Sequence, residues 1–366
     1  MKTMTYQSTH SRLPFVYEAL PTRVIFGSGT RSAVSDEAIR LNMSRVLILH
    51  GPPHIGMADQ LASQLSERHV GTFGGARMHT PVDVTEVALA LAVRLRVDGI
   101  VAIGGGSTTG LAKALALRTD LPQIVLPTTY AGSEMTPILG ETEDGIKTTQ
   151  RSLKVLPETV IYDVDLTMDL PSGISGVSGM NAVAHSVEAL YAREANPVIS
   201  ALALQSIRAL VKALPAIHAV PGNRSARSDA LYGAWLAGIC LGSVGMALHH
   251  KLCHTLGGTF DLPHAETHAI VLPHALAYNA PAIPDVMAKL RDALGIADVP
   301  SALHEVNRAI GAPRGLSEIG MPEDGIEQAL EQAMANPYWN PRALERDSLH
   351  RLIVRAYHGD APIVGN

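Results

Sequence analysis

"VAIGGGSTTGLAKAL", residues 101–115, joins a β-branched run to a helical one through Gly104, Gly105 and Gly106. Glycines lack a Cβ, so a phosphate can approach the backbone there, and the N–H groups that open the helix favour its negative charge. The spacing is neither the G-x-G-x-x-G of the usual dinucleotide fold nor a Walker loop. Three consecutive glycines also form ordinary tight turns, so a pyrophosphate site and a plain turn both explain this stretch.

The chain around this turn alternates between short apolar runs and amphipathic stretches. The apolar runs are continuous, which is typical of strands covered on both faces, and they lie at 22–27, 45–51, 98–106, 123–129 and 159–165. Helical patterns lie among them, at 58–69, 84–96 and 109–117. Alternation of this kind predicts a doubly wound parallel sheet.

The apolar runs stop near residue 171, and helical periods rich in alanine and leucine follow to the end of the chain. We therefore expect an α/β plus all-α protein, with a dinucleotide-binding domain over 1–170 and a helical domain over 171–366. The stretch 170–176 is a plausible hinge. Ligands commonly bind between two such domains.

Composition excludes several classes of partner. The net charge is −5, the aromatic content is 4%, and no basic stripe is present, which argues against nucleic acid. The two cysteines, Cys240 and Cys253, lie in apolar surroundings and read as buried thiols of a reducing compartment. The N-terminal stretch lacks an apolar signal core, and no run reaches the ~18 apolar residues of a membrane span. These features predict a cytoplasmic protein.

A second candidate for coenzyme contact is "LPTTYAGSEMTP", residues 126–137. It places the hydroxyls of Thr128, Thr129 and Ser133 just after a strand, where doubly wound sheets bind ligands. A Ser/Thr-rich turn with a helix cap is the alternative. Its place beside the glycine turn favours the coenzyme.

Histidines gather in the helical half. Asn181 and His185 are four residues apart and share a helix face, as do His250 and His254, and His264 follows a glycine break. A lone histidine is usually a core or surface residue, but this group in apolar surroundings predicts a cleft lined by imidazoles. His249 and His268 are better explained as structural residues, because His249 points about 100° away from His250 on a helix.

Taken together, these motifs resemble the iron-containing alcohol dehydrogenase superfamily. The resemblance rests on GGGS opening a helix, PTT-x-x-x-SE, "GMNAVAH", the two histidines four apart, "PH" ten residues further on, and the terminal "NPRALERDSLHRLIVRAYHGDAP". It covers almost the whole chain. In that superfamily an aspartate and three histidines hold a divalent metal, and the matching positions here are Asn181, His185, His250 and His264. His254 matches a histidine close to the reacting carbon.

Two departures from the superfamily pattern point to one branch. Asn181 stands where the aspartate is expected, and Gly110 stands where GGGSxxD has its acid. With "GGGSTTGLAK", "PTTYAGSEMTP" and "HAETHAIVLPH", they resemble the maleylacetate reductases. The resemblance implies an enzyme that needs no metal. Such an enzyme reduces the carbon–carbon double bond of maleylacetate to 3-oxoadipate with NADH or NADPH, in bacterial degradation of aromatic compounds.

The chemistry agrees with this interpretation. An amide offers a metal only a dipole where a carboxylate offers a charge, so affinity for Fe²⁺ or Zn²⁺ should fall. The alkene of maleylacetate is already polarised by its ketone, so histidine donors suffice to stabilise the enolate that hydride addition creates. We therefore expect no metal.

Site roles follow from the resemblance. The coenzyme should contact a set of residues from both loops, Gly104, Gly105, Gly106, Ser107, Thr108, Thr128, Thr129, Ser133 and Lys154. His254 should donate the proton or stabilise the enolate, with His250, His185 and His264 shaping the pocket. Asn181, Tyr130, Lys147 and Arg151 should contact the dicarboxylate substrate, although charged residues of a turn are usually just solvated.

The second strand bears on coenzyme choice. It ends at His50 and Gly51, without the acid that would bond the ribose and repel a 2′-phosphate. Both NADH and NADPH should therefore be accepted.

Three other functions remain open at this stage. They are a metal-dependent alcohol or aldehyde dehydrogenase on the same fold, a dehydroquinate-synthase-like lyase, and a non-catalytic nucleotide sensor. Family analogy favours a homodimer.

Overall fold

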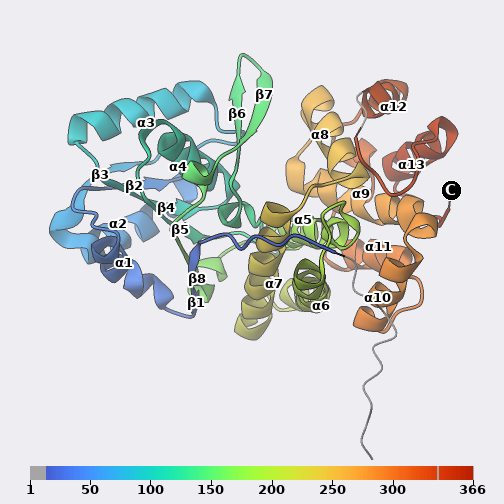
Figure 1. The fold of residues 1–366 in the computed structure, drawn as a ribbon, viewed down its shortest axis with the longest axis horizontal. Coiled ribbons are helices and arrows are strands. Elements are labelled where there is room, and N and C mark those ends of the chain that lie inside the picture. Colours follow the sequence, from blue (N-terminus) through green and yellow to red (C-terminus); the bar gives the residue numbers. More distant parts are fainter. Residues whose placement is uncertain (1–13, 336–337, 366) are drawn as a thin grey trace, which may run out of the picture.

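A computed structural model describes residues 14–335 and 338–365 of the chain. The sheet half and the helical half lie side by side, and a hairpin rises between them (Figure 1). The expected combination of an α/β half and an all-α half is confirmed.

Six parallel strands form the main sheet, in the order β1-β8-β5-β4-β2-β3. Their bounds are β1 Arg23–Gly27, β2 Val46–His50, β3 His69–Phe73, β4 Gly99–Gly104, β5 Gln123–Pro127 and β8 Thr159–Asp163. The chain runs from β2 outward to β3 and then returns to the other side of β2 with β4. The carboxyl ends of β2 and β4 therefore flank the point where strand order reverses, which is the usual ligand crevice of an open parallel sheet.

Helices cover both faces of this sheet, because alternate residues of each strand point to opposite sides. Along β2, Ile48 packs with helices α1 and α2, whereas Leu47 and Leu49 pack with α3 and α4. These helices are α1 Val34–Arg40, α2 Ile55–Leu65, α3 Val82–Leu95 and α4 Gly106–Thr119. Burial on both faces explains why the strands are continuous apolar runs in the sequence.

Two features of the sheet half are absent from the sequence prediction. Strand β3 was missed, because its residues 69–73 are only partly buried and carry no continuous apolar run. The antiparallel hairpin of β6 Ile138–Glu143 and β7 Ile146–Arg151 was read as a charged turn. The predicted helix over 58–69 is really α2 followed by a short 3-10 turn over 66–68.

The helical half begins with α5, Ser172–Tyr191, soon after β8 ends at Asp163. It continues through α6 Pro197–Ala219, α7 Arg224–Ser243, α8 Leu248–Phe260, α9 His264–Asn279, α10 Pro284–Leu294, α11 Val299–Ala309, α12 Gly325–Ala335 and α13 Arg346–His358. The change of element type falls near the predicted boundary at 170/171, and the division into two folding domains stays a prediction.

Helix α6 is long and apolar enough to cross a membrane by length and composition, as are α7 and α8 if their bent pair counts as one span. It packs instead against α5 and α7, through a buried stripe that includes Ile199, Ile207 and Leu214. Core helices of globular proteins commonly share this composition.

Candidate active site

The glycine turn lies at the carboxyl edge of the sheet, with Gly104 ending β4 and Gly105 capping α4. The Gly105 carbonyl accepts the N–H groups of Thr108 and Thr109, each at 3.1 Å. Gly104 has φ +156°, and a Cβ on it would come within 2.3 Å of Thr108 Oγ1. The turn therefore requires glycine, and Thr108 packs beneath it.

The loop that follows β5 lies against this turn. The N–H of Thr128 donates to the Gly104 carbonyl at 3.1 Å. A Cβ on Gly105 would come within 2.8 Å of the Thr129 side chain, so the two loops touch. The predicted neighbourhood of "GGGS" and "PTT" exists in the structure.

The open side of the turn fits a phosphate group. Gly106 is the first residue of α4, and a Cβ on it would meet only Ser133 Oγ, at 4.0 Å. That hydroxyl is buried and has no hydrogen-bond partner among the described residues. The first-turn N–H groups of α4, including that of Ser107, have no acceptor within the helix. An unpaired hydroxyl beside such N–H groups suits a phosphate oxygen.

Lys113 holds this loop in place and was missed in the sequence. Its buried Nζ donates to the carbonyls of Ser133, Thr136 and Ile138, at 2.5, 2.6 and 2.9 Å. This role of Lys113 could not be predicted from the sequence, because its partners are backbone groups distant along the chain.

The structure gives a steric reason for Gly110, which stands where the superfamily has an acidic residue. A Cβ on Gly110 would come within 2.2 Å of Thr80 Oγ1. Thr80 therefore fills the space in which an aspartate side chain would begin.

The end of β2 adds two histidines to the carboxyl edge of the sheet, where the coenzyme is predicted to bind. His50 Nδ1 donates to the Gly51 carbonyl at 2.8 Å, and His54 Nε2 lies 3.0 Å from Thr128 Oγ1. Burial and the nearby His50 lower the pKa of His54. His54 was missed, because nothing in sequence links it to the loop after β5.

Histidines from three helices converge in the helical half. The ring centroids of His185 and His250 lie 4.9 Å apart, and those of His264 and His268 lie 4.2 Å apart. His254 lies 6.2 Å from His250 and 6.4 Å from His264. The structure thus brings together all four predicted histidines.

His249 and His268 belong to the same cluster, contrary to their interpretation as structural residues outside it. His249 Nε2 lies 3.0 Å from His268 Nδ1, and both rings are fully buried. His249 does point away from the His250 direction, but α9 brings His268 to meet it. The helical wheel of one helix held no information about that neighbour.

Glu188 is the principal residue that the sequence analysis missed. Its fully buried carboxylate accepts the N–H groups of Ala247 and His249 at 2.9 Å, and His250 Nδ1 lies 2.7 Å from its Oε2. His250 Nε2 in turn lies 2.8 Å from His185 Nδ1. A hydrogen-bonded chain therefore runs from Glu188 through His250 to His185. The signal was present, because Glu188 follows His185 by three residues on the same helix.

Burial disfavours the charged form of the deeper histidines. Desolvation, followed by the ring of His250, lowers the pKa of His185 and of His249 well below the ordinary range. Desolvation, followed by His264, does the same for His268. His254 and His264 are exposed, so the cluster reaches the surface at these two rings.

The position that binds a metal in the superfamily does not fit one well here. Asn181 supplies an amide in place of a carboxylate, and its Oδ1 is buried without a hydrogen-bond partner among the described residues. Among the described residues, a group of three potential ligand atoms within 4.8 Å of one another occurs at a different place. These atoms belong to His249, Cys253 and His268.

Two predicted contacts lie elsewhere in the structure. Lys154 Nζ is 3.6 Å from Asp120 Oδ2, beyond the far end of α4, whereas the glycine turn lies at its start, about 20 Å away along a 14-residue helix. The position of Lys154 therefore does not support its predicted coenzyme contact. The Tyr130 ring is fully buried in the core, with Arg227 among its charged neighbours, so its position does not support the predicted substrate contact.

The two cations predicted for the substrate carboxylates lie on the hairpin. Arg151 Nη2 donates to the Gly242 carbonyl at 2.6 Å and ties the base of β7 to the end of α7. Lys147 also belongs to β7, and its side chain lies outside the described part of the structure.

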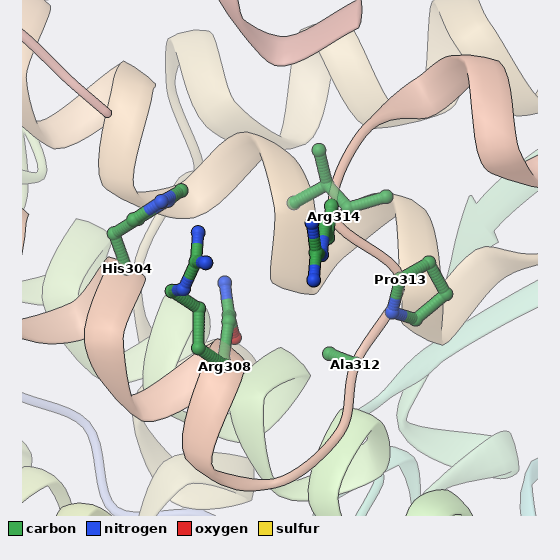
Figure 2. Close-up of a pocket in the computed structure, with 7 residues that line it drawn as sticks. His304, Arg308, Ala312, Pro313 and Arg314 are labelled. Atoms are coloured by element: carbon green, nitrogen blue, oxygen red, sulfur yellow. The ribbon is translucent and has the colours of Figure 1, made fainter. Parts of the chain in front are cut away.

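A separate hollow lies on another side of α9 (Figure 2). It is lined by Ile270, His304, Asn307, Arg308 and Arg314 among others, and Asn307 also donates to the Ala269 carbonyl at 2.5 Å. None of the predicted site residues lines it.

Known proteins match this chain in sequence and in fold along nearly its whole length. Residues 21–164 match the family described as "Iron-containing alcohol dehydrogenase", and residues 176–357 match "Fe-containing alcohol dehydrogenase family, C-terminal". The chain belongs to the iron-containing alcohol dehydrogenase family.

Within that family the chain is similar to maleylacetate reductases, as the sequence motifs predicted. A maleylacetate reductase of Sphingobium indicum is 54% identical over 96% of this chain and 99% of that protein. Another, from Rhodococcus opacus, is 49% identical over 95% of this chain and 98% of its own. The crystal structure of a maleylacetate reductase from Rhizobium sp. strain MTP-10005 superposes with a TM-score of 0.92 at 51% identity, over 95% of this chain and 99% of that one.

Proposed function

We propose that this iron-containing alcohol dehydrogenase family member is a maleylacetate reductase that works without a bound metal. The observation that carries the proposal is Asn181, which stands among buried histidines at the position of the family's metal. The extent of the match to named maleylacetate reductases supports the same substrate. The product is 3-oxoadipate, within bacterial degradation of aromatic compounds.

The coenzyme would lie along the carboxyl edge of the sheet. Its pyrophosphate would bind the first turn of α4 and Ser133 Oγ, where the structure offers an open backbone and an unpaired hydroxyl. When bound, NADH or NADPH supplies the hydride. The end of β2 carries His50 and Gly51 and no acid, which supports acceptance of both coenzymes.

The histidine cluster would stabilise the charge that develops on the substrate. Hydride addition to the alkene carbon β to the ketone leaves an enolate, and its α carbon then takes a proton. His254 is exposed at the mouth of the cluster, and we assign to it the proton donation or the stabilisation of the enolate oxygen. Glu188 holds His250 through its Nδ1 and so fixes the ring that stands beside His254.

One assay tests the function directly. Purified protein should oxidise NADH when maleylacetate is added, and the rate should be unchanged after EDTA treatment. His254→Ala should lower kcat by roughly 10²–10⁴-fold and leave the dissociation constant of NADH unchanged. Loss of activity on chelation, restored by Fe²⁺ or Zn²⁺, would instead establish a metal-dependent dehydrogenase.

Homodimerisation and a cytoplasmic location, both expected from the sequence, belong to this proposal. The proposed partner is a small dicarboxylate and not a nucleic acid, and the net charge of −5 without a basic stripe supports the second part.

A further inference from the structure

A thiol and two imidazoles face one another at the buried end of the histidine cluster. Cys253 Sγ lies 3.7 Å from His249 Nε2, which lies 3.0 Å from His268 Nδ1. The three ligand atoms are all within 4.8 Å of one another. All three side chains are almost fully buried. They come from two helices, since His249 and Cys253 are four residues apart on α8 and His268 lies on α9.

This donor set matches the chemistry of soft and borderline divalent ions. Zinc binds imidazole nitrogen at about 2.0–2.1 Å and thiolate sulfur at about 2.3 Å, so ligands on one tetrahedral ion lie about 3.3–3.6 Å apart. The observed separations of 3.0 and 3.7 Å bracket that range. We propose that Cys253, His249 and His268 form a binding site for Zn²⁺ or Cd²⁺, and that occupation of this site inhibits the enzyme.

The proposed site is distinct from the position of the family's metal. That position corresponds to Asn181, His185, His250 and His264, and none of these supplies a ligand here. The two sites differ in their donors, because only the proposed site has a thiolate, which selects soft ions over hard ones. A carboxylate is not required for the new site.

The histidine cluster provides a route inward. His264 is exposed, and its ring centroid lies 4.2 Å from that of His268, which lies 4.9 Å from that of His249. Successive imidazoles therefore lead from the surface to Cys253. On binding, the Cys253 S–H bond breaks, its proton leaves to solvent, and the thiolate sulfur bonds to the ion.

The surroundings predict an acquired ion of moderate affinity. Metal-bound histidines usually donate their second N–H to a fixed partner. Here His249 Nδ1 and His268 Nε2 are buried without a hydrogen-bond partner among the described residues. The ion should inhibit because it adds positive charge next to His250, whose ring centroid lies 5.0 Å from that of its ligand His268.

Cadmium is the probe, because its thiolate complexes have a charge-transfer absorption that histidine complexes lack. Titration of the EDTA-treated protein with Cd²⁺ should give this band at one equivalent per chain. Cys253→Ser and Cys253→Ala should abolish the band, and should raise the Cd²⁺ and Zn²⁺ concentrations for half-inhibition roughly tenfold or more. Cys240→Ser is the matched control, because Cys240 is the other buried cysteine and lies on α7. It should leave band and inhibition unchanged.

The band needs no substrate, so its outcome is independent of the proposed function. The proposal is overturned if the band is missing, or if it survives in the Cys253 variants. It is also overturned if inhibition persists in those variants and disappears in His264→Ala, because the ion would then sit at the position of the family's metal.

Discussion

Replacement of Glu188 by glutamine tests whether the chain from Glu188 through His250 to His185 organises the site. Oε2 of Glu188 accepts from the Ala247 N–H and from His250 Nδ1, and Oε1 accepts from the His249 N–H at 2.9 Å. A glutamine keeps one acceptor oxygen and turns the other into a donor. Either orientation therefore sets an NH₂ group against an N–H group.

The magnitude follows from these bonds. In the less damaging orientation, the NH₂ group faces the His249 N–H. The charge-assisted hydrogen bond from that N–H, worth about 1.5–3 kcal/mol, is then lost. The remaining bonds to the amide oxygen lose their charge assistance. Because the site is fully buried, we expect the free energy of unfolding to fall by about 3–5 kcal/mol. We expect kcat to fall about 10- to 100-fold, since His250 loses the partner that fixes its tautomer.

Urea unfolding measures the first quantity, and steady-state kinetics separates kcat from KM. Nitrogen-15 chemical shifts of the histidines report whether His250 still carries its hydrogen on Nδ1. If Glu188 had a purely structural role, the replacement would leave these shifts unchanged. Glu194→Gln is the matched control, because Glu194 accepts one backbone N–H, from Gly245, at an exposed site. It should change stability by no more than about 0.5 kcal/mol. A Glu188→Gln protein with unchanged kcat and an unchanged His250 signal would refute the reasoning.

Four further results are expected. Gly106→Ala should raise the KM for NADH at least tenfold while leaving the free energy of unfolding unchanged or slightly higher, because a methyl group has room in the fold but stands where the phosphate would bind; an unchanged KM would remove the turn from coenzyme binding. NADH and NADPH should differ in kcat/KM by less than roughly 100-fold, or ~2.7 kcal/mol, since no acid follows β2; a larger NADH preference contradicts this. Burial, with smaller contributions from His304 and Arg355, lowers the pKa of His274 to about 3, so the unfolded chain binds a proton that the folded one excludes. Stability from this group is complete above pH 6.5 and is lost as pH falls toward 3, so between pH 6 and 4 the wild type should lose about 1.4 kcal/mol per pH unit more than His274→Asn in urea unfolding; equal slopes would refute it. Asn181→Asp should increase zinc bound after dialysis, by roughly tenfold in affinity, and a metal content equal to that of the wild type would show that the amide is not what excludes the ion.

Local patterns predicted most of the sheet and the two loops at its carboxyl edge. The continuous apolar runs of β2, β4 and β5 follow from burial on both faces, which each strand records in its own sequence. Strand β3 and the β6–β7 hairpin have no continuous apolar run, because they are half-exposed and depend on their neighbours for pairing. Lys154 was assigned to the coenzyme from resemblance alone, and the structure places it at the wrong end of α4.

The sequence by itself determined the class of fold, the glycine turn, the family and the replacement of a carboxylate by Asn181. These are properties of short segments, since periodicity and residue type are written in consecutive positions. Only the tertiary structure decided that Glu188 holds His250, that His268 meets His249 beside Cys253, and that Tyr130 is a core residue. Such contacts join different helices, and the packing angle and register between helices are set by many distant side chains at once.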